Sequence, residues 1–125
     1  MYLLDTHTLI WFLADSPELS ANAREVICSN ENIFASYISL WEMAIKKGLG
    51  KLRFQYFFKD IVQMCYDERI RLLNITSTDL DNLENLPFIH RDPFDRMLVS
   101  QAQTRNLCII TRDRTIPKYD LRTLW

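Results

Sequence analysis

Glycine and cysteine are scarce in this chain of 125 residues, and each scarcity excludes a class of site. The only two glycines, Gly48 and Gly50, precede a lysine but lack the Gly-x-x-x-x-Gly-Lys-Ser/Thr spacing of a phosphate-binding loop, which argues against nucleotide binding there. The three cysteines form no Cys-x-x-Cys pair, so zinc ribbons and thioredoxin-type redox sites are not indicated. An odd number of widely spaced cysteines instead predicts reduced, buried thiols in a cytosolic protein.

The sequence also has no long hydrophobic run and no excess charge of either sign. Its first residues show no basic region followed by an apolar stretch, and the apolar run at 8–14 is too short to span a bilayer. Fifteen basic and sixteen acidic residues give a net charge of −1. We therefore expect a cytoplasmic protein without a membrane partner, in which any nucleic acid is bound by local charge patterning.

What is present is the composition of an ordinary globular domain. Apolar residues make up 48% and charged residues 25% of the chain, which is close to the average for such domains. A chain of this length buries roughly two-thirds of the surface that its unfolded state exposes, so it needs no metal or disulfide to fold. No repeat and no linker-like stretch interrupts it, and we expect a single domain over residues 1–125.

Short apolar runs alternate with longer amphipathic segments along the chain. The runs predict β-strands at 2–4, 33–35, 71–75 and 107–111, with a weaker candidate at 121–125. The segments between them predict α-helices at 7–14, 21–29, 40–47, 57–69, 79–86 and 93–104. This alternation predicts parallel strands covered by helices on both faces, which is a three-layer α/β/α domain. The functional crevice of such a sheet lies beyond the carboxyl ends of its strands.

Four acidic residues lie at that predicted edge. Asp5 ends the first strand and Asp113 follows the fourth, while Glu42 and Asp95 lie in the first turns of two predicted helices. In a doubly wound sheet all four converge on one crevice, where they repel one another unless a cation lies among them. Hard divalent cations prefer sites made only of oxygen ligands, so the sequence predicts bound Mg²⁺, with Mn²⁺ as the alternative.

Three of these acids also have a purely structural interpretation. Ser39 and Glu42 match a capping box, with Ser39 as the N-cap and Glu42 at the third helical position. Asp92 is a natural N-cap for the next helix, whose dipole favours Asp95 in the first turn. Asp113 can accept hydrogen bonds in a turn. The acid that closes the first strand has no such interpretation, because no obvious cap is expected there.

Five short stretches contain or follow these acids. They are LLDTH (3–7), SLWEMAIK (39–46), HRDPFDRML (90–98), TRD (111–113) and YDL (119–121). In this order, and across essentially the whole chain, they resemble a PIN-domain ribonuclease of the kind that is the toxin in VapBC-type toxin–antitoxin pairs. The resemblance implies that Asp5, Glu42, Asp95 and Asp113 are the catalytic, metal-binding acids. It also implies a central five-stranded parallel sheet, metal-dependent cleavage of RNA and inhibition by a cognate antitoxin protein.

The chemistry of RNA hydrolysis fits these residues. The reaction needs an activated water, a neutralised phosphate and a stabilised leaving oxygen, and one or two Mg²⁺ ions can supply all three. No lysine or histidine is marked by the sequence as a separate general base. We therefore assign activation of the water to the metal and a carboxylate partner, with Asp5 as the predicted bridging ligand.

Basic residues flank the predicted acidic centre. Five basic residues and no acid lie between Glu42 and Asp60. Such flanks would let an RNA backbone approach a metal site, although they also fit an ordinary solvated helix face. The predicted RNA contacts are Lys46, Lys47, Arg96 and Arg112. We expect His7 and His90 to lie near the crevice as hydrogen-bonding or phosphate-contacting groups rather than as metal ligands.

Two other functions remain open from the sequence. One is a housekeeping RNA-processing nuclease of the same kind without an antitoxin. The other is a receiver-like signalling or binding module, which is also α/β with acids at its strand ends. A receiver needs a phosphoacceptor aspartate after its third strand, where this chain has Thr76-Ser77-Thr78. This mismatch disfavours the signalling interpretation.

Aromatic residues are concentrated between Phe54 and Tyr66. They predict more apolar surface than one small core can cover. We therefore expect a homodimer, and a groove near the helices that accepts a segment of the antitoxin.

Overall fold

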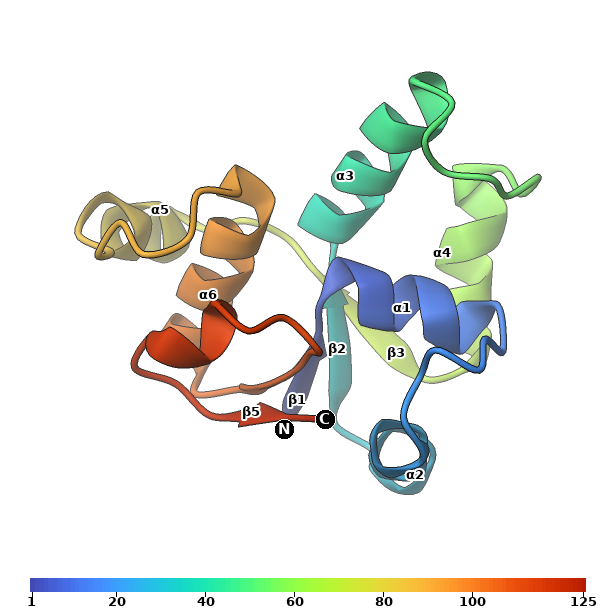
Figure 1. Cartoon of the computed structure of the whole chain (residues 1–125), viewed down its shortest axis with the longest axis horizontal. Coiled ribbons are helices and arrows are strands. Elements are labelled where there is room, and N and C mark those ends of the chain that lie inside the picture. The colour runs from blue at the N-terminus through green and yellow to red at the C-terminus, as the bar shows by residue number, and fades with distance from the viewer.

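The computed structural model describes residues 1–125 as five β-strands, six α-helices and one short 3-10 helix (Figure 1). The strands are β1 (Tyr2–Leu4), β2 (Ile33–Ser36), β3 (Ile70–Leu73), β4 (Cys108–Ile110) and β5 (Thr123–Leu124). The helices are α1 (Thr6–Leu13), α2 (Ala21–Ser29), α3 (Tyr37–Gly48), α4 (Phe58–Asp67), α5 (Ser77–Glu84), α6 (Pro93–Arg105) and the 3-10 helix η1 (Ile116–Lys118). No helix combines the length and the apolar character needed to cross a lipid bilayer.

The five strands form one parallel sheet in the order β3-β2-β1-β4-β5. In the centre, Leu3 of β1 pairs with Phe34 of β2, and Leu4 pairs with Ile110 of β4. The chain builds outward from β1 to β3 and then returns to add β4 and β5 on the other side. The strand order therefore reverses between β1 and β4, which is where doubly wound sheets bind their ligands.

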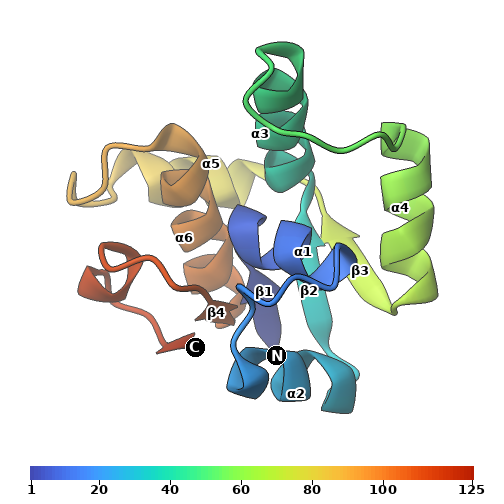
Figure 2. The ribbon, with the colours of Figure 1, turned by 45° about the vertical axis from the view of Figure 1, so that its right-hand side comes forward.

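Alternate residues of the central strands point to opposite faces of the sheet and join two separate cores. Leu4 and Ile110 lie in a cluster with residues of α1, α2, α3 and α4, whereas Leu3 and Ile109 lie in a second cluster with residues of α6. Figures 1 and 2 both show α5 and α6 on one side of the central strands and α4 on the other. The predicted three-layer architecture with a five-stranded parallel sheet is confirmed.

Every predicted strand and helix occurs, with its ends displaced by three residues or fewer. The strand expected at 71–75 ends at Leu73, because the Asn74 carbonyl accepts hydrogen bonds from Gln101 and Arg105 of α6 and so leaves the sheet. The helix expected at 40–47 begins three residues earlier. These side-chain contacts are tertiary, and local sequence patterns do not contain them.

The three cysteines are free thiols, but only Cys65 and Cys108 are buried. Cys28 is exposed, so the prediction of buried thiols is wrong at this position. The reason is that α2 turns Ala23 and Ile27 into the core. The residue after Ile27 then lies about 100° away around the helix, outside the buried face.

Candidate active site

The four predicted acids line one cavity of about 350 Å³ beyond the carboxyl ends of β1 and β4. Eleven residues line the cavity, and only one of them is hydrophobic. They are Asp5, Thr6, His7, Trp11, Glu42, Lys46, His90, Asp92, Asp95, Arg112 and Asp113. Five carboxylates therefore face two permanently basic side chains, Lys46 and Arg112. Such an excess of negative charge favours the binding of a cation.

Asp5 is oriented by hydrogen bonds to both of its carboxylate oxygens. It directly follows β1 and N-caps α1, where Oδ1 accepts a hydrogen bond from the backbone N–H of Thr8 at 2.9 Å. Its Oδ2 accepts a hydrogen bond from the hydroxyl of Thr111, which follows β4. The expectation that Asp5 has no helix to cap is therefore wrong. Because α1 begins at Thr6, directly after Asp5, one residue serves both as a cap and as a wall of the cavity.

Glu42 is not part of a capping box, and that structural interpretation is wrong. Ser36, the last residue of β2, caps α3 by accepting a hydrogen bond from the N–H of Ile38 at 3.1 Å. Glu42 therefore lies in the second turn, and Ser39 is buried inside the first. The Glu42 carboxylate accepts hydrogen bonds from the Thr6 hydroxyl at 2.7 Å and from Lys46 Nζ at 2.5 Å. It faces the cavity because the helix starts early.

Asp92 caps α6, as predicted. Its Oδ1 accepts hydrogen bonds from the backbone N–H groups of Phe94 at 2.8 Å and Asp95 at 3.2 Å, and Pro93 occupies the first helical position. Asp95 is thereby held in the first turn with only 17% of its side chain exposed. The cap and the cavity acid are thus two different residues of one short motif.

One carboxylate oxygen of Asp113 accepts hydrogen bonds within a turn, and the other faces His90 in the cavity. Its Oδ1 accepts hydrogen bonds from the N–H groups of Thr115 at 2.7 Å and Ile116 at 2.9 Å, so the turn interpretation is confirmed. Its Oδ2 lies 3.3 Å from Nε2 of His90. Burial acts to raise the pKa of Asp113, but the hydrogen bonds from Ile116, Thr115 and His90 outweigh it and hold the pKa below its usual value.

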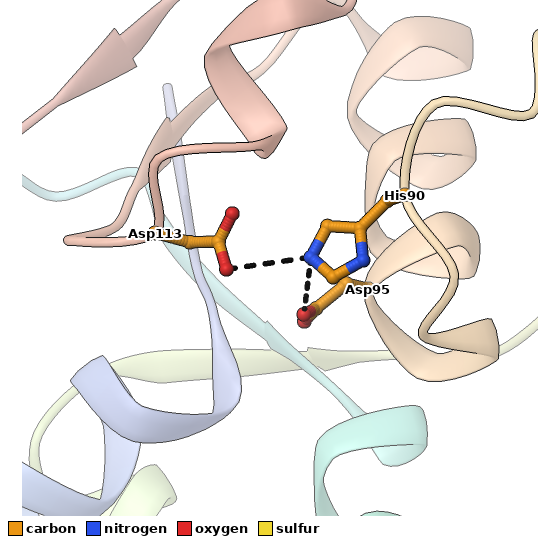
Figure 3. Close-up of side chains that lie close together, drawn as sticks. All are labelled: His90, Asp95 and Asp113. Atoms are coloured by element: carbon orange, nitrogen blue, oxygen red, sulfur yellow. Dashed lines mark hydrogen bonds and ion pairs between the residues drawn. The ribbon is translucent and has the colours of Figure 1, made fainter.

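His90 links the third and fourth acids (Figure 3). Its Nε2 lies 3.1 Å from Oδ2 of Asp95 and 3.3 Å from Oδ2 of Asp113, and ligand atoms of the three side chains lie within 4.8 Å of one another. The other ring nitrogen, Nδ1, accepts a hydrogen bond from the backbone N–H of Asp92 at 3.1 Å. A nitrogen that accepts cannot carry the proton, so the proton of neutral His90 resides on Nε2. In this arrangement His90 is therefore a hydrogen-bond donor to the two carboxylates.

Burial and like charge raise the pKa of two of the acids. Burial raises the pKa of Asp5 above its usual value, despite the hydrogen bonds that Thr111 and Thr8 donate to it. The pKa of Asp95 is raised to about 8, first by burial and then by the negative charges of the other four carboxylates of the cavity. A cation bound among these carboxylates would lower both pKa values, because it favours the charged form of each acid.

Two of the four predicted RNA contacts line the cavity. The ammonium group of Lys46 is bound to Glu42, and the Lys46 side chain is about one-third exposed. The guanidinium group of Arg112 lies 4.4 Å from the ring centroid of Trp11 and donates a hydrogen bond to Glu18 at 2.8 Å. Both cations therefore stand beside the carboxylates and remain accessible to solvent.

The other two predicted RNA contacts do not line the cavity. Lys47 donates a hydrogen bond to the backbone carbonyl of Tyr56 at 2.8 Å and lies over the ring of Phe54. Arg96 donates hydrogen bonds to the carbonyl of Pro87 at 2.9 Å and to the hydroxyl of Tyr119 at 3.2 Å. The helices turn both residues away from the carboxylates, and both side chains hold neighbouring loops instead.

Sequence reasoning did not single out Thr6, Thr111 or Trp11 as part of the site. The two threonines each stand next to the end of a strand, where a hydroxyl can bond a neighbouring acid. Trp11 lies four residues after His7, so the two side chains share one face of α1. The four-residue spacing from His7, which follows Asp5 by two residues, is the sequence signal that could have identified Trp11.

Comparison with known proteins gives a family and a fold. Residues 2–121 match the PIN domain family. No curated protein matches the sequence significantly. The match covers nearly the whole chain and leaves the receiver-like interpretation without support.

Several solved structures share the fold at low sequence identity. VapBC2 from Rickettsia felis, bound to a DNA fragment from its promoter, is 17% identical with a TM-score of 0.73, over 98% of this chain and 96% of that chain. FitAcB from Neisseria gonorrhoeae is 18% identical with a TM-score of 0.69, over 100% and 97% of the two chains. DNA-bound VapBC from Salmonella typhimurium is 19% identical with a TM-score of 0.69, over 98% and 96%. At these identities the likeness is one of fold.

Proposed function

This chain belongs to the PIN domain family, whose members are nuclease-type hydrolases, and from that premise we propose that it is a Mg²⁺-dependent endoribonuclease. We propose further that it is the toxin of a VapBC-type toxin–antitoxin pair, built as a single PIN domain over residues 1–125. The observation that carries the proposal is the convergence of Asp5, Glu42, Asp95 and Asp113 on one cavity with too little positive charge to balance them.

The donor set of the cavity fits a hard divalent cation. Asp5, Glu42, Asp95 and Asp113 offer only carboxylate oxygens, which are the ligands that Mg²⁺ and Mn²⁺ prefer. We assign these four residues as the metal ligands and catalytic acids. When bound, Mg²⁺ would activate a water molecule for attack on the phosphodiester and neutralise charge on the phosphate.

The surrounding residues of the chain orient the carboxylates before substrate arrives. Thr111 and the N–H of Thr8 fix the two oxygens of Asp5. Thr6 and Lys46 do the same for Glu42. Supporting hydrogen bonds of this kind set the direction in which a ligand's free electron pair points, which is what metal affinity depends on.

His90 orients the other two carboxylates, those of Asp95 and Asp113. Its Nε2–H is shared between Asp95 and Asp113, so one imidazole holds residues from α6 and from the loop after β4 at a constant separation. Lys46 and Arg112 are the two cations on the lining that can attract the phosphates of RNA. Since the cavity is otherwise acidic, these two side chains supply the positive charge for RNA binding, in addition to the charge that a bound metal would contribute.

The decisive experiment is cleavage of structured RNAs by the purified protein. We expect cutting in single-stranded loops, whose backbone can bend into the cavity and whose bases are free. Cutting should require Mg²⁺ or Mn²⁺, stop in EDTA, and leave a 5′-phosphate and a 3′-hydroxyl, because water attacks rather than the ribose 2′-hydroxyl. Cleavage without metal, or ends that carry a 2′,3′-cyclic phosphate, would contradict the proposed mechanism.

We also propose a protein antitoxin and a homodimer as partners. A toxin–antitoxin complex from Klebsiella pneumoniae also shares the fold, at 19% identity and a TM-score of 0.67, over 100% of this chain and 97% of that chain. Tyr56, Phe57 and Tyr66 are each more than half exposed, which is the apolar surface that a partner would cover. Light scattering at high concentration should report a dimer, and a strictly monomeric chain would contradict that part of the proposal.

Growth in cells separates a toxin from a housekeeping nuclease. We expect expression of the natural chain to arrest growth and expression of Asp5→Asn to have no effect. Co-expression of the protein encoded immediately upstream should restore growth if that protein is the antitoxin. A natural chain that cleaves RNA in vitro but does not affect growth would favour the RNA-processing role.

A further inference from the structure

One wall of the cavity differs from the rest because it is made of stacked flat groups. The ring of His7 stacks on that of Trp11, with centroids 5.4 Å apart and planes at 28°. The guanidinium carbon of Arg112 lies 4.4 Å from the same Trp11 centroid. All three residues belong to the lining of the cavity, where Trp11 is the sole hydrophobic member. We refer to His7, Trp11 and Arg112 as the stacked wall.

The stacked wall is tied covalently to two of the proposed metal ligands. His7 follows Asp5 by two residues on α1, and Arg112 directly precedes Asp113. Trp11 is itself braced by the ring of Trp125, which meets it edge-on at 5.9 Å. The distance from the stacked wall to the carboxylates is therefore set by α1 and by the short segment that directly follows β4.

Internal packing does not account for all of this wall. The contact with Trp125 explains why the indole of Trp11 is half-buried, since it closes the C-terminus over α1. It does not explain His7, which is exposed, or Arg112, whose side chain is 52% exposed and pairs only with the equally exposed Glu18, at 2.8 Å. Two flat polar groups are thus held in stacking position at the mouth of an acidic cavity with their outer surfaces open to solvent.

Flat aromatic and guanidinium groups beside a phosphate-binding site are the elements that bind unpaired nucleobases. Single-stranded RNA is recognised by stacking of splayed bases on aromatic rings or on arginine planes. A base has no negative charge, so it can approach an acidic cavity that repels further phosphates. His7 offers its outer face to a base and Arg112 offers its charge to a phosphate, so together they can hold both parts of one nucleotide.

We propose that the stacked wall of His7, Trp11 and Arg112 is a nucleobase subsite, which binds one unpaired base of single-stranded RNA next to the cleaved phosphate. The proposal rests on the proposed RNase function and names how that site selects its substrate. The base stacks on the outer surface of His7 and the phosphate contacts Arg112. The subsite explains a preference for single-stranded loops, because a base inside a helix cannot reach it.

Binding of short oligonucleotides tests the subsite without cleavage. The probes are a single-stranded RNA and the same RNA with one abasic nucleotide beside the cleavage site, both titrated in an Asp95→Asn background so that they stay intact. We expect His7→Ala to weaken binding of the complete RNA by about 5- to 100-fold, the range for loss of one base stack. His7→Phe, which keeps a flat ring, should restore most of the affinity.

The abasic probe and a control variant make the result specific. The abasic RNA should bind His7→Ala and the parent protein equally, since it has no base to stack. Phe88→Ala removes an aromatic side chain that is 76% exposed and does not line the cavity, so it should change neither affinity. Melting temperatures of all variants should agree within a few degrees, which confirms that each is folded.

Each remaining outcome overturns one proposal or the other. Equal affinity of His7→Ala and its parent for the complete RNA would overturn the nucleobase subsite. An equal loss with both probes would overturn it too, because His7 would then contact the backbone. The proposed function fails separately, if the unmodified chain shows no metal-dependent cleavage while the binding measurements keep their pattern.

Discussion

Two largely buried carboxylates lie at opposite ends of α6, and their pKa values are shifted in opposite directions. Near the C-terminal end of α6 lies Asp79 of α5, whose side chain is fully buried. Arg105 donates hydrogen bonds to both of its oxygens, at 2.6 and 3.1 Å, and the hydroxyl of Thr104 donates another at 2.7 Å. Burial alone would raise the pKa of Asp79, but these donors and Thr76 lower it to about 2.

At the N-terminal end of the same helix, Asp95 has no such counter-charge. Its side chain is also mostly buried, yet its neighbours are four further carboxylates and the imidazole of His90. Its pKa is raised to about 8 as a result. The chain therefore supplies a partner to the carboxylate that holds α5 on α6. It provides no such partner for Asp95, whose charge must be neutralised by a bound cation or proton. This arrangement lowers the stability of the metal-free fold, which is typical of a functional site.

The largest effect that this comparison predicts is on activity. Asp95→Asn keeps the shape of the side chain but removes one ligand charge, and we expect RNA cleavage to fall by about 10²-fold or more, as for loss of a preorganised electrostatic group. Asp81→Asn, on the exposed surface of α5, is the matched control and should cleave normally. Initial rates on one RNA at saturating Mg²⁺ give the measurement. Normal cleavage by Asp95→Asn would remove Asp95 from the site.

The next largest effect is on stability, at the other end of the helix. Asp79→Ala leaves Arg105 without its partner and removes the capping box of α5, so we expect a loss of about 3 kcal/mol in the free energy of unfolding. Urea denaturation with Asp81→Ala as control measures it. A loss below about 1 kcal/mol would show that the ion pair behaves like one on the surface.

The sequence predicts the structural and the functional end of α6 unequally. Hydrophobic runs and helix-ending signals were enough for the order, type and approximate bounds of the strands and helices, because the two cores follow directly from alternating burial along β1 and β4. The ion pair of Asp79 with Arg105 was not predicted. It joins residues 26 positions apart, and no local pattern marks such a contact.

The candidate site was predicted as far as residue type and strand position determine it. The four acids meet in one cavity because parallel strands bring their carboxyl ends to one edge. The direction of side chains was beyond the sequence. Lys46 and Lys47 are adjacent, yet only the first faces the cavity, since the start of α3 at Tyr37 sets the rotation of the whole helix.

In the absence of metal, mutation of the two carboxylates should change stability in opposite directions: loss of Asp79 should destabilise the fold and loss of the Asp95 charge should stabilise it. In EDTA at pH 7, Asp95→Asn removes the cost of protonating Asp95 when the chain folds, and we expect a gain of about 1–2 kcal/mol in stability. Added Mg²⁺ should stabilise the natural chain and have a much smaller effect on the variant. Thermal melts with and without metal provide the test, and destabilisation of Asp95→Asn in EDTA would contradict the excess of negative charge.

The pH dependence of stability should separate the two carboxylates further. The folded-state pKa of Asp79 lies below the ordinary value of 3.8, so its contribution is present above pH 4 and is lost as the pH falls toward 2. The folded-state pKa of Asp95 lies above 3.8, so without metal its cost grows as the pH rises from 4 to about 8. The stability advantage of Asp95→Asn should grow over that interval, and an advantage independent of pH would exclude this cause.

The smallest predicted effect distinguishes the cap of α6 from the charge of the cavity. Asp92 both caps the helix and adds negative charge beside Asp95. Asp92→Ser keeps a capping oxygen and removes the charge, whereas Asp92→Ala removes both. In EDTA we therefore expect Ser to be more stable than Ala by about 1 kcal/mol, the value of an N-cap, and at least as stable as the natural Asp. If the natural Asp is more stable than both, its charge favours the helix dipole more than it disfavours Asp95.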